Sequence, residues 1–114
     1  MKTYNKLVRD LIPHIIEESG KSCDWRYCTT LTEYEDFLRK KMNEEMEEFF
    51  EDPCPEEAAD MYEVMRAILW LHEMDTEFME TVAAEKRDRR GGFGNMILLK
   101  EVYEKGEKEW LIII

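Results

Sequence analysis

Carboxylates are the residues best able to do chemistry in this sequence, and ten acidic residues crowd into the stretch KKMNEEMEEFFEDPCPEEAADMYEVM. Successive residues of a helix advance by about 100°, so the directions of their side chains can be compared. In the first half of the stretch, Glu45 and Glu48 fall inside the arc of methionines and phenylalanines. In the second half, Glu57 and Asp60 fall inside the equivalent apolar arc. Helices that pack through these arcs would bring the four carboxylates together.

A buried carboxylate without a partner is strongly unfavourable, so such a cluster needs a compensating charge. A divalent cation supplies it, because an i, i+3 carboxylate pair on each of two helices holds Mg²⁺ and leaves positions for waters or phosphates. Ligation by oxygen alone favours Mg²⁺ or Mn²⁺, and His14 and His72 do not form the Glu-x-x-His pairs of a di-iron bundle. Alternatively the acids are solvated, since Glu57 and Asp60 lie in a first turn, where the helix dipole favours anions.

Helices must position these side chains, and the sequence predicts the first two from their apolar spacing. Residues 8–16 carry apolar side chains along one helical face, and Gly20 marks the end of that helix. Thr32 and Glu35 have the spacing of a capping box. The second helix is therefore expected over about residues 33–51.

Two prolines separate the second helix from the third. Pro53 and Pro55 cannot sit inside a helix, but Pro55 is well suited to open one. The third helix is expected to run from there to about residue 74. Asp75 or Thr76 would then cap a fourth helix, which ends at the glycines of RDRRGG. The short turn predicts that the second and third helices pack antiparallel.

Two segments have the features of β structure. Residues 22–30 lack helical periodicity and are rich in aromatic and β-favouring types, which predicts a short extended segment. The tail from residue 95 to residue 114 has two apolar runs on either side of Lys105-Gly106, which is typical of a hairpin. The expected fold is mainly α with a little sheet.

Composition limits the classes of partner. The 114 residues fit a single domain over 1–114, and a domain this small often gains stability by forming a homodimer or homotetramer. The net charge of −11 argues against nucleic acid polymers, whose binding requires cationic side chains. No apolar run has the length of a membrane helix, no signal-peptide region is seen, and the three cysteines form no Cys-x-x-Cys pair. A cytoplasmic protein without a membrane partner is expected.

The acidic motifs resemble those of a known superfamily. Glu44-Glu45-x-x-Glu48 followed by Glu57-x-x-Asp60 is similar to the EExxE and ExxD signature of the all-α NTP pyrophosphohydrolases, the superfamily of MazG, dimeric dUTPase and phosphoribosyl-ATP pyrophosphohydrolase. The stand-alone phosphoribosyl-ATP pyrophosphohydrolase-like branch is the nearest in pattern. The resemblance covers residues 4 to about 99 and is carried by four blocks: YNKLVRDLIP (4–13), FLRKKMNEEMEE (37–48), EEAADMYEVMRAI (56–68) and KRDRRGGF (86–93).

This resemblance implies a four-helix MazG-like bundle and the Mg²⁺-dependent cleavage of a nucleoside triphosphate between its α and β phosphates, with release of pyrophosphate. House-cleaning of non-standard nucleotides is the implied role. The catalytic residues would be Glu44 and Glu45, with Glu44 either supporting the site or orienting or deprotonating the attacking water. The implied metal ligands are Glu45, Glu48, Glu57 and Asp60. The implied triphosphate-binding residues are Lys6, Arg9, Lys41, Lys86, Arg89 and Arg90.

Two alternatives remain beside this expectation. The same site could act on phosphoribosyl-ATP itself, in histidine biosynthesis. The chain could instead be a non-catalytic, nucleotide-sensing helical oligomer that retains the acidic interface, with the C-terminal WLIII as a partner strand. For the basic residues, the alternative to phosphate binding is ordinary surface charge.

Overall fold

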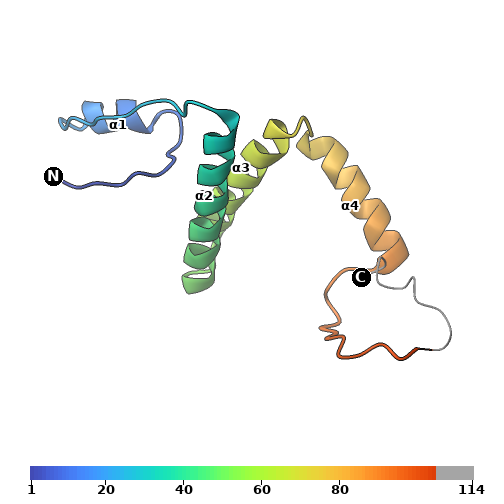
Figure 1. Cartoon of the computed structure of the whole chain (residues 1–114). Helices are drawn as coiled ribbons and strands as arrows, with labels where there is room; N and C mark the ends of the chain where they lie inside the picture. Colours follow the sequence, from blue (N-terminus) through green and yellow to red (C-terminus); the bar gives the residue numbers. More distant parts are fainter. Residues whose placement is uncertain (105–114) are drawn as a thin grey trace. The chain divides into compact units, whose positions relative to one another are not determined.

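A computed structural model describes residues 1–104 of the chain (Figure 1). Its elements are all helices: α1 (Ile12–Glu18), α2 (Leu31–Glu51), α3 (Pro55–Leu71) and α4 (Thr76–Arg90). The predicted mainly α fold class is therefore confirmed. None of these helices is long and apolar enough to cross a membrane.

The chain divides into two compact units, Met1–Glu80 and the part from Thr81 onward. All four predicted metal ligands belong to the first unit. The expectation of one domain over residues 1–114 stays a prediction.

The first helix is shorter than the sequence predicts. α1 begins at Ile12, because Pro13 lacks an N–H and its fixed φ suits the first turn of a helix. The chain before it, which includes Val8, is not helical. The predicted end is confirmed, since Gly20 has a φ of +89°, a conformation that costs glycine little.

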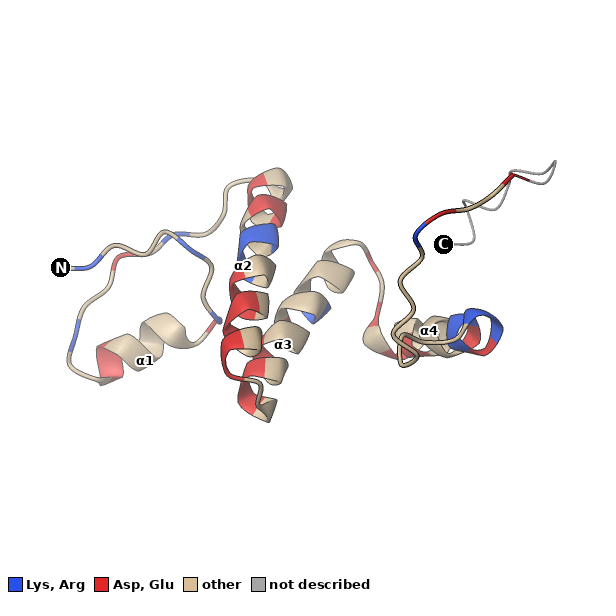
Figure 2. Cartoon of the chain, turned by 90° about the horizontal axis from the view of Figure 1, so that it is seen from below, with Lys and Arg blue, Asp and Glu red and all other residues tan. Residues whose placement is uncertain are grey.

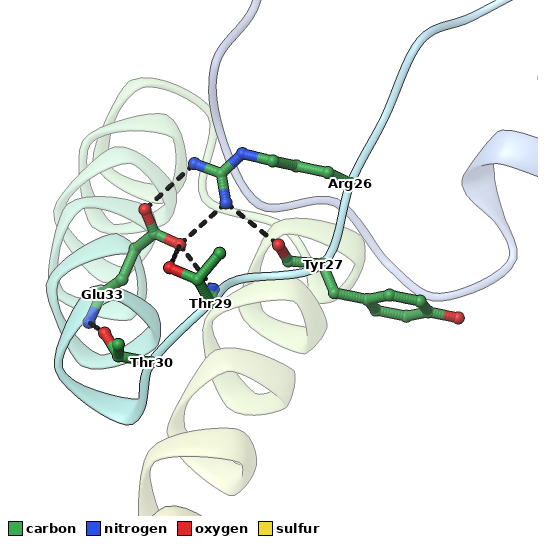
Figure 3. Close-up of polar contacts among 5 residues, drawn as sticks. All are labelled: Arg26, Tyr27, Thr29, Thr30 and Glu33. Atoms are coloured by element: carbon green, nitrogen blue, oxygen red, sulfur yellow. Dashed lines mark hydrogen bonds and ion pairs between the residues drawn. The ribbon is translucent and has the colours of Figure 1, made fainter.

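α2 begins two residues before the predicted start (Figure 3). The N–H of Glu33 donates to the Thr30 hydroxyl at 3.0 Å, and the Glu33 carboxylate accepts from the N–H of Thr29 at 2.8 Å. Arg26 adds two charged hydrogen bonds to the same carboxylate, at 2.9 and 3.0 Å. The predicted capping box at Thr32 and Glu35 is wrong, because Thr30 is the residue that caps the helix, and Glu33, three residues later, bonds back to the N–H of Thr29.

α2 and α3 form an antiparallel hairpin, and they are the helices that pack against each other in the unit Met1–Glu80. The linker between them contains only the residues from Asp52 to Cys54. Leu38 on α2 and Val64 on α3 are the buried apolar side chains, at 3% and 9% exposure. The break at the two prolines is as predicted, although α3 ends at Leu71 rather than near residue 74.

α4 has the ends that the sequence predicts. The N–H of Phe78 donates to Asp75 Oδ1 at 2.7 Å, which makes Asp75 the capping residue. At the other end, the N–H of Gly91 donates to the carbonyl of Arg87 at 2.8 Å, with a glycine φ of +82°.

The two β predictions do not hold within the described residues. Residues 22–30 form no strand, because no neighbouring chain pairs with them, and their last residues serve the cap of α2 instead. Residues 95–104, the first arm of the predicted hairpin, contain no strand either. The predicted turn at Lys105-Gly106 and the second arm lie outside the described residues.

Candidate metal centre

The α2–α3 hairpin places two glutamates in its contact region. Glu45 follows Leu38 by seven residues and Glu57 precedes Val64 by seven, so each glutamate lies on the same helical face as a buried apolar side chain. The result is unusual for a charged group: Glu45 is only 5% exposed. Figure 2 shows the acidic residues along α2 in red. The candidate site consists of carboxylates on this helix and on the first turns of α3.

Five carboxylates come together in two overlapping groups. Glu44, Glu45 and Glu48 form one group, and Glu45, Glu57 and Asp60 form the other. In each group, one oxygen per residue lies within 4.8 Å of the others. Oxygens on opposite sides of a bound Mg²⁺ are about 4.2 Å apart, so small side-chain movements bring either group to ligand distances. Glu45 belongs to both groups and is the centre of the cluster.

The cluster also contains carboxylate oxygens that lack a partner. Glu45 Oε2 and Glu57 Oε2 are fully shielded and accept no hydrogen bond from the protein. A shielded carboxylate oxygen in this state is unfavourable unless something else pairs with it. Hard oxygen donors without protein partners are what Mg²⁺ or Mn²⁺ requires, so the residues present fit such an ion.

Three cations border the carboxylates. Lys41 Nζ lies 3.2 Å from Glu45 Oε1 and 3.6 Å from Glu44 Oε1, within the same helix. Lys6 Nζ lies 2.7 Å from Glu44 Oε1. Arg9, in the same N-terminal segment as Lys6, places Nη2 at 2.7 Å from Asp60 Oδ1. Three positive charges therefore face five negative ones, which leaves a net charge of −2 when all are ionised.

The environment moves the pKa values of these groups in opposite directions. Burial raises the pKa of Glu45 above its ordinary value, although Lys41 acts to lower it. Burial also raises the pKa of Glu57, and the negative charges of Asp60 and Glu45 add to the effect. The pKa of Glu44 is lowered, chiefly because Lys6 donates a hydrogen bond to it. Glu44 is thus held ionised, whereas the positive charge near Glu45 and Glu57 is too small to offset the effect of burial on their pKa values.

The structure brings together most of the residues that the sequence selects. The predicted ligands all belong to the two groups, but Glu48 is exposed rather than buried, because its direction on α2 lies at the edge of the contact with α3. Lys6, Arg9 and Lys41 border the carboxylates, as their proposed phosphate role requires. The remaining predicted cations, Lys86, Arg89 and Arg90, lie on α4 beyond the unit that holds the carboxylates, and their role stays a prediction.

One feature of the site has no counterpart in the sequence-based expectations. Lys6 pairs with a carboxylate 38 residues away and Arg9 with one 51 residues away. The sequence predicts the basic residues of NKLVRD as phosphate ligands, but nothing in their local pattern indicates which acidic residues they contact. The one sequence feature that points to these ion pairs is that basic residues of NKLVRD and acidic residues of the EExxE and ExxD motifs occur in the same chain.

Comparisons with known proteins leave the site to be interpreted from its own residues. No protein-family model, curated protein or solved structure matches the chain.

Proposed function

We propose that the chain is a Mg²⁺-dependent nucleoside triphosphate pyrophosphohydrolase, which cleaves between the α and β phosphates to give a monophosphate and pyrophosphate. The observation that carries the proposal is Glu45, a buried carboxylate with an unpartnered oxygen that is shared by two groups of possible ligands. The similarity of the EExxE and ExxD motifs to those of the all-α NTP pyrophosphohydrolases supports the same reaction. Mn²⁺ could replace Mg²⁺.

The chain's own residues would divide the work between metal binding and phosphate binding. The metal would be held by Glu45, Glu48, Glu57 and Asp60. A bound divalent cation neutralises phosphate charge and makes a water more acidic. Glu44, which belongs to the first group of carboxylates but not to the proposed ligands, would orient or deprotonate the attacking water. The cationic side chains around the cluster would hold the triphosphate, since charged donors bind phosphate oxygens well.

The substrate is a free nucleotide in this proposal, and the setting is the cytoplasm, where its three free thiols are stable. A nucleic acid polymer is not proposed, because the net charge of −11 opposes it. House-cleaning of non-standard nucleotides is the first choice of role. Phosphoribosyl-ATP is the second choice, since the same site chemistry would serve it.

The proposal is tested by incubating the protein with Mg²⁺ and a panel of canonical, modified and phosphoribosylated nucleotides. Pyrophosphate, and not orthophosphate, is the expected product by chromatography. Glu45→Gln and Asp60→Asn should each lower kcat/KM by at least about 100-fold, because each removes a proposed ligand. The control is Glu47→Gln, an exposed acid on the same helix that belongs to neither group of carboxylates and should keep the activity.

The outcomes separate the hypotheses. Preference for phosphoribosyl-ATP over every triphosphate would select the second role. A folded protein that binds Mg²⁺ and nucleotide but releases no product would contradict catalysis and favour the nucleotide-sensing oligomer.

We also propose that the hairpin pairs with a second copy of itself. Seen from its N-terminal end, α2 carries Met46 and Phe50 on one flank of the contact with α3, and the corresponding flank of α3 carries Tyr62 and Met65. These four side chains, here called the apolar face, are 40 to 75% exposed. The acidic groups occupy the opposite flank. Since the chain is strongly acidic, like charges oppose contact between copies elsewhere, and the apolar face is where two hairpins can meet.

A further inference from the structure

We infer that the N-terminal segment is a cation-responsive latch, in which Lys6 and Arg9 act as internal counter-ions of the carboxylates and give way when a divalent cation binds. The inference rests on the metal site proposed above and concerns the regulation of that site. The term latch is used here for residues 4–9.

The geometry shows that the two cations of the latch occupy the site itself. Lys6 Nζ and Arg9 Nη2 each lie 2.7 Å from a carboxylate oxygen, the first on α2 and the second on α3. The latch thus contacts both helices of the hairpin, near both groups of possible ligands. Asp60 belongs to one of these groups and Glu44 to the other, so the latch and a divalent cation compete for the same negative charge.

The attachment of the latch is mainly electrostatic. Of residues 1–10, only Leu7 is partly buried, and the others are exposed. The helices that pack together in this unit are α2 and α3, whereas α1, which follows the latch, is not part of that packing. An attachment of this kind gives way readily when its charge partners are neutralised, because no large apolar surface has to be exposed.

The charge balance gives the direction of the effect. With the latch in place, the five carboxylates and three cations leave a net charge of −2, which matches one divalent cation. Without Lys6 and Arg9 the net charge becomes −4, so the attraction for divalent cations increases. Release of the latch also frees two cationic side chains beside the site, where they can bind the phosphates of a nucleotide.

The experiment is a calorimetric titration of the full chain with Mg²⁺ alone. Exposed ion pairs are each worth a factor of about 1.4 to 5 in an equilibrium constant. Because the double variant Lys6→Gln/Arg9→Gln removes two such pairs, it should bind Mg²⁺ about 2- to 25-fold more tightly than the native protein. The matched control, Lys2→Gln/Lys21→Gln, removes the same charge from exposed positions that pair with none of the five carboxylates, and should change the affinity by less than about twofold.

A second measurement uses the native chain and does not depend on the folding of a variant. Tryptic cleavage after Lys6 and Arg9, normalised to cleavage after Lys100, should become faster when Mg²⁺ is added. Unchanged cleavage, or an affinity of the double variant equal to or below that of the native chain, would overturn the latch while the metal site stands. If the native chain and Glu45→Gln both fail to bind Mg²⁺, the metal site itself is rejected, and the latch with it.

Discussion

Glu45 and Glu57 each combine a position that is unfavourable for the fold with a place in the candidate site. Each is positioned by the same helical spacing that places Leu38 and Val64 in the contact between the helices. Each also carries a shielded oxygen that no group of the protein satisfies. Sites for substrates and metals often retain such groups at a cost in stability, and removal of the charge then stabilises the fold while it abolishes function.

The replacement Glu57→Gln should therefore raise the melting temperature of the protein in EDTA. The reason is that burial and the neighbouring acids raise the pKa of Glu57, so its ionised form opposes folding at neutral pH. In Mg²⁺ the order should reverse, because the native chain gains stability from the ion and the variant gains little. Differential scanning fluorimetry in both buffers measures this. Glu56→Gln, in the same first turn but in neither group of carboxylates, is the control for the loss of a charge near the helix dipole.

At the scale of the element, α2 depends on an arrangement of charge at its first turn. The Glu33 carboxylate accepts hydrogen bonds from Arg26 and from the Thr29 N–H, which lower its pKa to about 2 (Figure 3). These contacts also connect the preceding segment to the start of the helix. The cap has no part in the metal site, so its contribution can be measured separately.

Glu33→Gln should destabilise the protein at pH 7, and the difference from the native chain should vanish as the pH falls. A carboxyl with a lowered pKa stabilises the folded state above its ordinary value of 4.5, and this contribution is lost as the pH approaches about 2. Urea unfolding of both proteins between pH 2 and pH 7 measures the difference. A gap that stays constant with pH would contradict the role of the ionised carboxylate.

The helices could be predicted because their signals are local. Apolar spacing, prolines and capping residues lie within a few positions of the feature that they determine, and they located the hairpin, its turn and both ends of α4. The cap of α2 differs from the predicted one because Thr30 and Thr32 both have a glutamate three residues later, and what distinguishes them is the contacts of Glu33 with Arg26 and with the Thr29 N–H. The segment 22–30 has β propensity but forms no strand, because a strand requires a partner strand to pair with.

In the candidate site too, the sequence predicts some features and not others. The four proposed ligands follow from helical angles, which need no knowledge of distant residues. The ion pairs of Lys6 and Arg9 could not be predicted, because the path of the chain between them and the helices follows no periodic pattern.

At the scale of the whole molecule, the hairpin buries too little apolar surface to be complete alone. Only Leu38 and Val64 among the apolar residues of the described chain are buried, whereas Phe50 is 75% exposed. Contact through the apolar face of two copies would remove on the order of 1,000 Å² from water, which is near the lower limit for a specific interface. Association would thus complete a core that one hairpin only begins.

Met65→Lys should therefore shift the protein toward the monomer by at least about tenfold in dissociation constant, because a charge would be buried in the apolar face. Light scattering coupled to size-exclusion chromatography, over a range of concentrations, measures the shift. Trp70→Lys introduces the same charge at an exposed apolar residue on the other flank of α3 and should leave the assembly unchanged. Equal behaviour of the two variants would contradict the assignment of the face.

The short connection between α2 and α3 has a consequence for how the ligands act together. Glu48 and Glu57, one from each group of carboxylates, are joined along the backbone by the end of α2, the linker from Asp52 to Cys54 and the start of α3. The length of the linker sets the effective concentration of the carboxylates of one helix at those of the other. Each doubling of the length of a flexible loop adds only about 0.6 kcal/mol to the entropic cost of closing it. Prolines on both sides of Cys54 restrict the linker further, so under the proposed function the hairpin would act as a preorganised multidentate ligand, and a longer, more flexible turn would weaken metal binding without changing the preferred ion.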